Sequence, residues 1–357
     1  MEIKKGKYRL IVLFVITAFC YYVGPRYPAF FSTTYHQKIY ALIDWILHQF
    51  THLFSFSIGD LMYALVILHV FYKTYFFIKN KTFIKLITFI TTYILLFFSL
   101  FQILWGFNNY KYSLAHQLEL DRNYTENDLN KLTHKLIKEV NLLHNELAAD
   151  VKSKIVIEKD LALFNRIAKE NYTRLPMELK EVLIQNPINK VKASFYSPFL
   201  SYSGFSGYFN PFTHENQVNT EVPSISMPIT VAHEMAHQLG ISSESEANFY
   251  GYQVMNLSND LRFRYAANLY ALRYCLKEHH HKANTTYHYW FSQLHPGIQE
   301  NIYETEKFWN EKRTVSTFLF KHIYGRFLKI NNQTDGIRSY NRFVDLLINY
   351  DKKNQEI

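Results

Sequence analysis

The chain is poor in charge and nearly free of cysteine. Charged residues make up 19% of its 357 positions, below the rough quarter that is usual in soluble domains, whereas hydrophobic residues make up 48%. Its two cysteines, Cys20 and Cys275, lie far apart, so no disulfide framework is expected. Most of the apolar excess precedes residue 110. The sequence therefore favours two units, a membrane region at 1–110 and a soluble domain at 111–357.

Nucleic-acid binding is not expected, although the formal net charge is +9. The lysines and arginines are spread along the chain and accompany no recognisable nucleic-acid motif. Lysines close to apolar segments are instead suited to anionic lipid headgroups. The lipid bilayer is therefore an expected partner, and nucleic acid is not.

Three apolar segments, at about 8–25, 58–78 and 86–108, are candidate transmembrane helices, each of which needs about 20 residues. The third is the strongest, because no charged residue lies between Leu86 and Tyr110. The second contains Asp60 near its start and Lys73 near its end, where a lysine can reach the interface. The first is short enough for a signal peptide, but bulky residues such as Phe19 stand where small ones would mark cleavage. A retained anchor is therefore favoured.

Basic residues predict the orientation of these segments, because loops rich in lysine and arginine stay in the cytoplasm. Two groups flank the segments: Lys4, Lys5, Lys7 and Arg9, then Lys73, Lys79, Lys81 and Lys85. Three spans that start inside leave everything after Tyr110 outside. We therefore expect a multi-pass protein of the bacterial inner membrane whose soluble domain faces the periplasm. Between the first two spans, Ile43 to Phe54 is typical of an amphipathic helix at the membrane surface.

The soluble part is expected to be mostly helical with a little sheet. Apolar residues three or four apart predict a helix from Thr125 to Leu147, and Thr125 with Asp128 resembles a capping box. The segment 191–209, rich in aromatic residues, serine and glycine, indicates strands and loops. From Pro228 onward the pattern is nearly all helical. The predicted fold class is mainly α, with a three-helix transmembrane region followed by a mostly helical α+β domain.

The segment that indicates chemistry is His233-Glu234-Met235-Ala236-His237. On a helix, two histidines four residues apart lie on one face and can bind the same zinc ion. Glu234 is then placed to act as general base toward a water molecule at the ion. A catalytic zinc usually takes three protein ligands and keeps one open position. Gly240 allows the chain to turn, and the next acidic residues, Glu244 and Glu246, are the candidates for the third ligand.

The spacing after Gly240 resembles the Glu-x-x-Ala-Asp pattern of glutamate-zincin peptidases. That resemblance implies that Glu244 is the third ligand and that Asn248 supports a ligand histidine. Asn248 stands where those peptidases often have aspartate, and the step from His237 to Glu244 is unusually short. Glu246 stays open as the alternative ligand, although on a helix it points away from Glu244.

Nearly the whole chain resembles a bacterial family of Bacteroidota known as domain of unknown function 3810. Five motifs carry the resemblance: SFSIGDLMY, WGFNNYKYSL, SGYFNPFTHENQVN, HEMAHQLGISSESEANF and KHIYGRFLKINNQTDGIRSYNRFVDLL. The family is similar to membrane-bound zinc peptidases. The resemblance therefore implies a membrane anchor and a zincin-like domain, and it implies no particular substrate.

Other residues carry weaker signals. His214 and Glu215 precede the HExxH helix. The resemblance to zincins implies an edge strand there that lines the substrate cleft, and packing in a loop is the other role that stays open. The run 279–281 consists of histidines, which indicates a solvated helix end more than a metal site. Arg264 and Tyr265 can stabilise an oxyanion, although packing is the favoured role.

These patterns together predict a membrane-anchored zinc peptidase. We expect His233, His237 and Glu244 to bind Zn²⁺, Glu234 to act as general base, and a peptide or protein to be the substrate. One alternative is a membrane sensor or scaffold that uses zinc without catalysis, and another is a zinc hydrolase of cell-wall peptides. An intramembrane protease is disfavoured, because the polar segment SSESE follows the motif at once.

Overall fold

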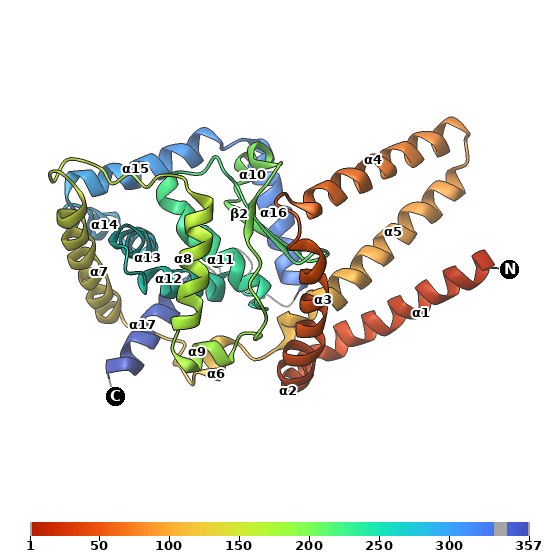
Figure 1. Cartoon of the computed structure of the whole chain (residues 1–357), viewed down its shortest axis with the longest axis horizontal. Helices are drawn as coiled ribbons and strands as arrows, with labels where there is room; N and C mark the ends of the chain where they lie inside the picture. Colours follow the sequence, from red (N-terminus) through yellow and green to blue (C-terminus); the bar gives the residue numbers. More distant parts are fainter. Residues whose placement is uncertain (1, 332–340, 356–357) are drawn as a thin grey trace.

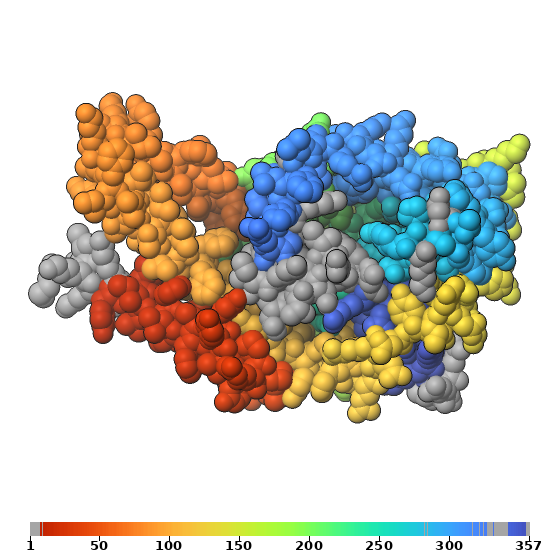
Figure 2. Space-filling model, turned by 180° about the vertical axis from the view of Figure 1, so that it is seen from behind, coloured from red at the N-terminus to blue at the C-terminus, as the bar shows by residue number. Residues whose placement is uncertain are grey.

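A computed structural model describes residues 2–331 and 341–355 of the chain. The first part of the described chain forms α1 (Glu2–Val23), η1 (Gly24–Arg26), α2 (Pro28–Phe30), the π-helical η2 (Phe31–Tyr40), α3 (Ala41–Thr51), α4 (Ile58–Lys79), α5 (Phe83–Leu104) and η3 (Gly106–Tyr110). Three of these helices, α1, α4 and α5, project from one side of a compact helical body (Figure 1). Figure 2 shows the same projection from behind, with α4 and α5 in orange.

The body is mainly helical and contains one small sheet. Its helices are α6 (Leu114–Gln117), α7 (Glu126–Leu147), α8 (Leu161–Arg174), α9 (Met177–Glu181), α10 (Ser197–Ser203), η4 (Ser224–Ser226), α11 (Met227–Gln238), α12 (Glu244–Asn256), α13 (Leu261–Lys282), α14 (Asn284–Phe291), α15 (Pro296–Glu311), α16 (Val315–Ile330) and α17 (Asn341–Gln355). Its strands are β1 (Val191–Ala193), β2 (Gly207–Asn210) and β3 (Glu215–Val218). The expectation of helices after Pro228 is confirmed over the described residues.

Two of the projecting helices, α4 and α5, are long and apolar enough to cross a membrane. They leave large apolar side chains on the outside, among them Phe71 at 72% and Ile84 at 83% exposed. The segment Leu10–Arg26 meets the same criterion only together with Pro28–Thr51, and this pair is bent by 109°. The sequence prediction is therefore confirmed for two apolar helices, while a third span stays a prediction.

Helix α3 has its polar side turned inward and its apolar side outward. Asp44 and Thr51 are buried against the body, whereas Leu42, Trp45 and Phe50 are each half or more exposed. Soluble helices normally show the opposite arrangement, with the apolar stripe facing the core. The amphipathic helix expected between residues 43 and 54 is therefore present but ends at Thr51, and its exposed face is the one suited to a membrane surface.

The sheet has the order β1-β3-β2, with β1 parallel and β2 antiparallel to the central strand β3. Helix α11 packs on this sheet and is nearly enclosed, since Ile229, Val231 and Met235 are at most 1% exposed. Sequence analysis expected strands and loops throughout 191–209, but helix α10 lies between β1 and β2. Pro198 in its first turn and Gly204, with φ of +83°, after its last turn give this short helix its start and its end.

The predicted capping box is present at the start of α7. The Thr125 hydroxyl accepts a hydrogen bond from the Asp128 backbone, and the Asp128 carboxylate accepts one from the Thr125 backbone. The helix that follows packs along α13. The capping box thus starts α7 at the residue that the sequence predicted, and the helix then packs on α13.

A buried carboxylate fixes the first turn of α4 to the sheet. The Glu215 side chain accepts hydrogen bonds from the backbone nitrogens of Ile58 at 3.1 Å and Gly59 at 2.6 Å. These nitrogens lack partners within their own helix, and a negative charge suits a helix N-terminus. Lys192 of β1 balances the charge, with its Nζ 2.6 Å from the carboxylate. An apolar projecting helix is thus anchored by an ion pair that is almost fully enclosed.

Asp60, the acidic residue at the start of the second apolar segment, also belongs to this junction. Its carboxylate accepts hydrogen bonds from the Ser194 hydroxyl, the Phe195 backbone nitrogen and the Tyr208 hydroxyl. The Ser57 hydroxyl accepts from the Asp60 backbone nitrogen and caps the helix. The carboxylate is therefore satisfied by the body and is not an unpaired charge within an apolar helix.

His214 makes the equivalent junction to α3 and α5. Its Nδ1 lies 3.0 Å from the Asp44 carboxylate, and its Nε2 lies 3.1 Å from the Leu104 carbonyl oxygen at the end of α5. His214 and Glu215 are both buried. Of the two roles that sequence analysis left open for them, packing is the one observed.

We predict that Glu215→Gln destabilises the protein by about 3 kcal/mol, because Lys192 keeps its charge in a buried place without its partner. Unfolding of the detergent-solubilised chain, monitored by circular dichroism, measures this change. Adding Lys192→Met should recover part of the loss.

Glu311→Gln is the matched surface control, because the Lys307–Glu311 pair is 77% and 63% exposed. It should change the free energy of unfolding by less than about 0.5 kcal/mol. Equal effects of the two glutamine variants would contradict the anchoring role of Glu215.

Candidate metal centre

A tight turn between α11 and α12 brings the two halves of the centre together. Gly240 has φ of +87°, a conformation that favours glycine, and the Ile241 backbone nitrogen donates to the Ala236 carbonyl across the turn. A Cβ at Gly240 would also lie 2.3 Å from a ring carbon of His36. The second helix then begins at Glu244.

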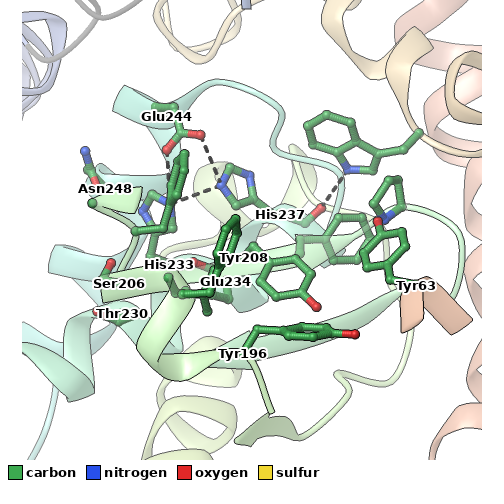
Figure 3. A pocket seen from close by; sticks show the side chains of 18 of the residues that line it. Tyr63, Tyr196, Ser206, Tyr208, Thr230, His233, Glu234, His237, Glu244 and Asn248 are labelled. Atoms are coloured by element: carbon green, nitrogen blue, oxygen red, sulfur yellow. Dashed lines mark hydrogen bonds and ion pairs between the residues drawn. The ribbon is translucent and has the colours of Figure 1, made fainter. Parts of the chain in front are cut away.

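His233, His237 and Glu244 converge at the start of this second helix (Figure 3). The two Nε2 atoms are 3.0 Å apart, and the Glu244 carboxylate oxygens lie 3.3 Å from His233 Nε2 and 3.9 Å from His237 Nε2. All three side chains are at most 16% exposed. Imidazole nitrogens and a carboxylate oxygen in one such group can hold a metal ion.

The spacing of these atoms fits a zinc ion. Tetrahedral coordination at 2.0–2.1 Å places ligand atoms about 3.3 Å from each other. The three observed separations lie around this value, so the side chains need only small rotations to bind one ion. Two histidines with one carboxylate form a ligand set that catalytic zinc sites use.

Neighbouring groups hold the ligands in place. His237 Nδ1 lies 2.6 Å from the Ile241 carbonyl oxygen, which leaves Nε2 for a metal. Asn248 lines the same cavity, and its Oδ1 accepts a hydrogen bond of 2.7 Å from the Tyr270 hydroxyl. The support from Asn248 that the glutamate-zincin resemblance implies is thus matched by its position beside His233 (Figure 3).

Glu234 is buried beside the metal ligands and carries an unsatisfied oxygen. Its Oε2 has no hydrogen-bond partner among the described residues. Burial raises the pKa of Glu234 to about 8. A buried carboxyl with a free oxygen, facing the same cavity as the ligands, is suited to take up and return a proton.

The two histidines differ in basicity without a metal. Burial, followed by the charge of His233, lowers the pKa of His237 to about 4. Burial also opposes the charged form of His233, but the Glu244 hydrogen bond and nearby carboxylates outweigh it, so its pKa is raised. Metal binding requires both imidazoles to be neutral, so His233 must release its proton when an ion binds.

Glu246 is not part of the group. Its Oε1 accepts a hydrogen bond of 2.8 Å from the Leu114 backbone nitrogen, on the other side of α12. Of the two open candidates for the third ligand, the structure therefore brings Glu244 to the histidines. Arg264 and Tyr265 also lie elsewhere, bound to Glu139 and Asn301.

The histidine run at 279–281 is only partly solvated. His279 is buried, with its Nε2 2.9 Å from the Thr133 hydroxyl, whereas His280 and His281 are exposed. Cys20 and Cys275 are both free, as expected. The last of the five sequence motifs runs through residues 332–340, including Arg338 and Tyr340, which lie outside the described residues.

Sequence analysis missed two tyrosines at the centre. Tyr270 and Tyr274 of α13 lie one helical turn apart, line the cavity beside Glu244, and have their hydroxyls 3.1 Å from each other. Their spacing is no different from that of ordinary packing residues on a buried helix. Only the placement of α13 against α12 reveals them.

The metal group lies in the wall of a cavity of about 680 Å³. Aromatic residues of the sheet edge and of the projecting helices form much of the rest of the wall, including Tyr63, Trp105 and Tyr208. Trp105 also donates a hydrogen bond of 3.4 Å to the His237 carbonyl oxygen. The group that could hold a metal ion therefore faces an open cavity on one side.

Comparison with known proteins places the chain in a family. Residues 35–348 match the family described as Protein of unknown function (DUF3810). The chain belongs to the DUF3810 family. The matched part includes α4, α5 and the whole metal group of this DUF3810 protein, whereas α1 precedes it. No curated protein and no solved structure matches the chain.

We predict that the chain binds close to one zinc ion and that each of three substitutions abolishes this binding: His233→Ala, His237→Ala and Glu244→Gln. Each of them removes one of the three ligands that the described residues supply. Metal content of the purified chain, measured by mass spectrometry, checks this. Glu246→Gln is the matched control. Glu246 lies two residues after Glu244 but binds the Leu114 backbone nitrogen, so this variant should keep its zinc. If Glu246→Gln lost its zinc while Glu244→Gln kept it, Glu244 would not be the third ligand.

Proposed function

We propose that this protein is a membrane-anchored, zinc-dependent peptidase that hydrolyses peptide bonds on the periplasmic side of the bacterial inner membrane. The observation that carries the proposal is the combination of three ligand side chains with a buried, unsatisfied Glu234 oxygen on one open cavity. A zincin-like fold and the zincin type of catalysis belong to this proposal.

The openness of the centre favours catalysis over a structural role. A structural zinc normally has four protein ligands and is closed to solvent. Here the described residues supply three, and the cavity leaves space beside them. A sensor or scaffold that binds zinc without catalysis does not need a buried carboxyl group with an unbonded oxygen beside the metal, such as that of Glu234.

The residues have separate roles in the proposed reaction. A bound zinc ion supplies Lewis-acid activation of water and of the peptide carbonyl. Glu234 accepts the proton of the attacking water and passes it to the nitrogen of the leaving amine. Tyr274 offers a hydroxyl on the same cavity wall, next to Glu244, that can donate to the carbonyl oxygen as negative charge develops.

An extended peptide fits the edge of the sheet beside the centre. Strand β2 pairs with β3 on one side and has no strand on the other within the described sheet. Ser206, Gly207, Tyr208 and Phe209 line the cavity along this strand. A peptide that adds to the edge of β2 can therefore use backbone hydrogen bonds to place its scissile bond at the metal group.

The arrangement of the projecting helices supports the proposed topology. The N-terminus of α1 and the turn between α4 and α5 lie at the same end, away from the body (Figure 1). Lys79, Lys81 and Lys85 belong to that turn, and the first residues of the chain are also basic. Both ends therefore suit the cytoplasmic face, with α3 at the outer surface and the metal centre in the periplasm.

Glu234→Gln is the direct test of catalysis. We expect its peptide hydrolysis to fall by about 10²–10⁴-fold, because the amide cannot accept a proton, while zinc content stays unchanged. Mass spectrometry of randomised peptide pools incubated with the full chain in liposomes measures the products. The same assay on isolated cell-wall peptides separates a general peptidase from a cell-wall hydrolase.

Full retention of the cellular function in Glu234→Gln, with zinc still bound, would sink the peptidase proposal. That outcome would instead favour the sensor or scaffold, which needs the ligands His233, His237 and Glu244 but not Glu234.

Gly207 provides a second prediction, because β2 passes very close to Glu234. A Cβ at this position would lie 2.7 Å from both Glu234 Oε1 and the Gln217 carbonyl oxygen. We expect Gly207→Ala to displace the carboxylate or the strand and to lower hydrolysis by about tenfold or more, with zinc retained. Ser206→Ala, which adds no atom, is the matched control and should have a much smaller effect.

A further inference from the structure

The cavity at the metal centre extends along the apolar helices. Ile67 lies about 13 Å along α4 from its start, and Phe97 lies about 10 Å before the end of α5, at 1.5 Å per residue. Both residues line the cavity, and both are about half exposed, at 51% and 52%. The two helices meet at their far turn and separate toward the body (Figure 1). The cavity is therefore open sideways between two helices that can cross a membrane.

The membrane-facing part of this cavity is apolar. Among its described lining residues there is no lysine or arginine, and the charged groups are those of the metal centre. Tyr63, Phe97, Phe101 and Phe212 form the wall on the side of the projecting helices. An apolar segment can lie there without burying an unpaired charge, whereas a lipid phosphate would find no cationic partner.

A second cavity of about 780 Å³ adjoins the first beside the metal centre. The two cavities share five lining residues: Gly204, Phe205, Ser206, Tyr270 and Tyr274. The second one extends from α10 and α16 to α14, and α14 lies on the part of the body away from the projecting helices (Figure 1). An extended chain can therefore run from the bilayer, past the metal group, into the body.

The second cavity has the opposite character. Its charged lining residues are Arg273, Lys277, Arg313 and Glu306, which gives a net positive charge. The guanidinium of Arg273 makes no hydrogen bond or ion pair with another described residue, although Glu306 lines the same cavity. Acidic side chains or a terminal carboxylate are the groups that such a cavity accommodates.

We infer that the substrate is a membrane-spanning polypeptide that enters sideways between α4 and α5 and is cut just outside its apolar segment, with acidic residues following on the body side. This inference rests on the proposed peptidase function. The free edge of β2 favours a polypeptide over a lipid, because it offers backbone donors and acceptors to the stretch that lies between the two cavities.

The test uses the full zinc-loaded chain in liposomes and three synthetic probes. The first has a leucine- and alanine-rich spanning segment joined directly to a randomised stretch that ends in acidic residues. The second has a flexible spacer of about 20 glycine and serine residues between the spanning segment and the randomised stretch. The probe stays in the membrane, but its randomised stretch is no longer held next to the spanning segment. The third carries the same stretch on two acyl chains. Products are identified by mass spectrometry.

We expect the first probe to be cut at least about tenfold faster than the second, although both are equally concentrated at the membrane. Equal rates for these two would overturn sideways entry. A rate for the acyl-linked probe equal to that of the first would overturn recognition of a spanning polypeptide in favour of a lipid anchor. Replacing the acidic residues of the first probe by neutral ones should lower its rate of cutting by the wild-type protein. The same change in the probe should lower the rate less for the Arg273→Gln protein.

Ile67→Trp tests the entrance itself. The larger side chain should slow cutting of the first probe by about tenfold, and an unchanged zinc content shows that the chain is folded. Leu68→Trp is the matched control, because Leu68 is 64% exposed and does not line the cavity. Equal effects of the two variants would overturn the proposed entrance.

Crosslinking separates this inference from the peptidase proposal. A photoreactive residue at position 67 in the Glu234→Gln chain should crosslink the apolar segment of the first probe, and one at position 68 should do so far less. If no probe is cut by the wild type, the peptidase function fails, and the crosslinking result alone supports or overturns sideways entry.

Discussion

The positive-φ turn at Gly240 is the constraint on which the metal centre and its membrane setting both depend. It reverses the chain within a few residues, so that Glu244 faces the two histidines of the preceding helix. Its missing side chain also lets His36 approach, and a Cβ there would overlap the imidazole. The same turn therefore forms the site and packs against His36 of η2, in the segment between α1 and α3. A larger residue would disturb both at once.

Polar side chains of the body, and not apolar packing alone, hold the projecting helices. Glu215 binds the first turn of α4, and His214 joins Asp44 of α3 to the end of α5. Two adjacent residues, His214 just before β3 and Glu215 at its start, thus position α3, α4 and α5. Because buried charges are costly unless they are paired and hydrogen-bonded, these junctions tolerate little displacement. The walls that α4 and α5 contribute to the cavity are fixed relative to the metal group for this reason.

The centre lies in the body outside the apolar helices, but its cavity reaches two of them. The polar segment after the HExxH motif argued for an active-site helix outside the bilayer, and α11 indeed lies within the body. Yet its cavity reaches Ile67 and Phe97 on the helices that can cross a membrane. The proposed cleavage of a bond near a membrane surface needs this arrangement, because the centre would stay in reach of water while the apolar part of the proposed substrate stays in lipid.

The sequence by itself determined the features that depend on neighbours along the chain. The spacing of His233 and His237, the capping box of α7 and the apolar lengths of α4 and α5 were all readable, because helical periodicity and hydropathy are local. The sequence favoured Glu244 over Glu246 only by resemblance and helix facing, and the tertiary structure placed Glu244 beside the histidines. Tertiary structure alone gave His214 and Glu215 their anchoring role and brought Tyr270 and Tyr274 to the centre. These depend on contacts between residues far apart in the chain, for which one sequence carries no periodic signal.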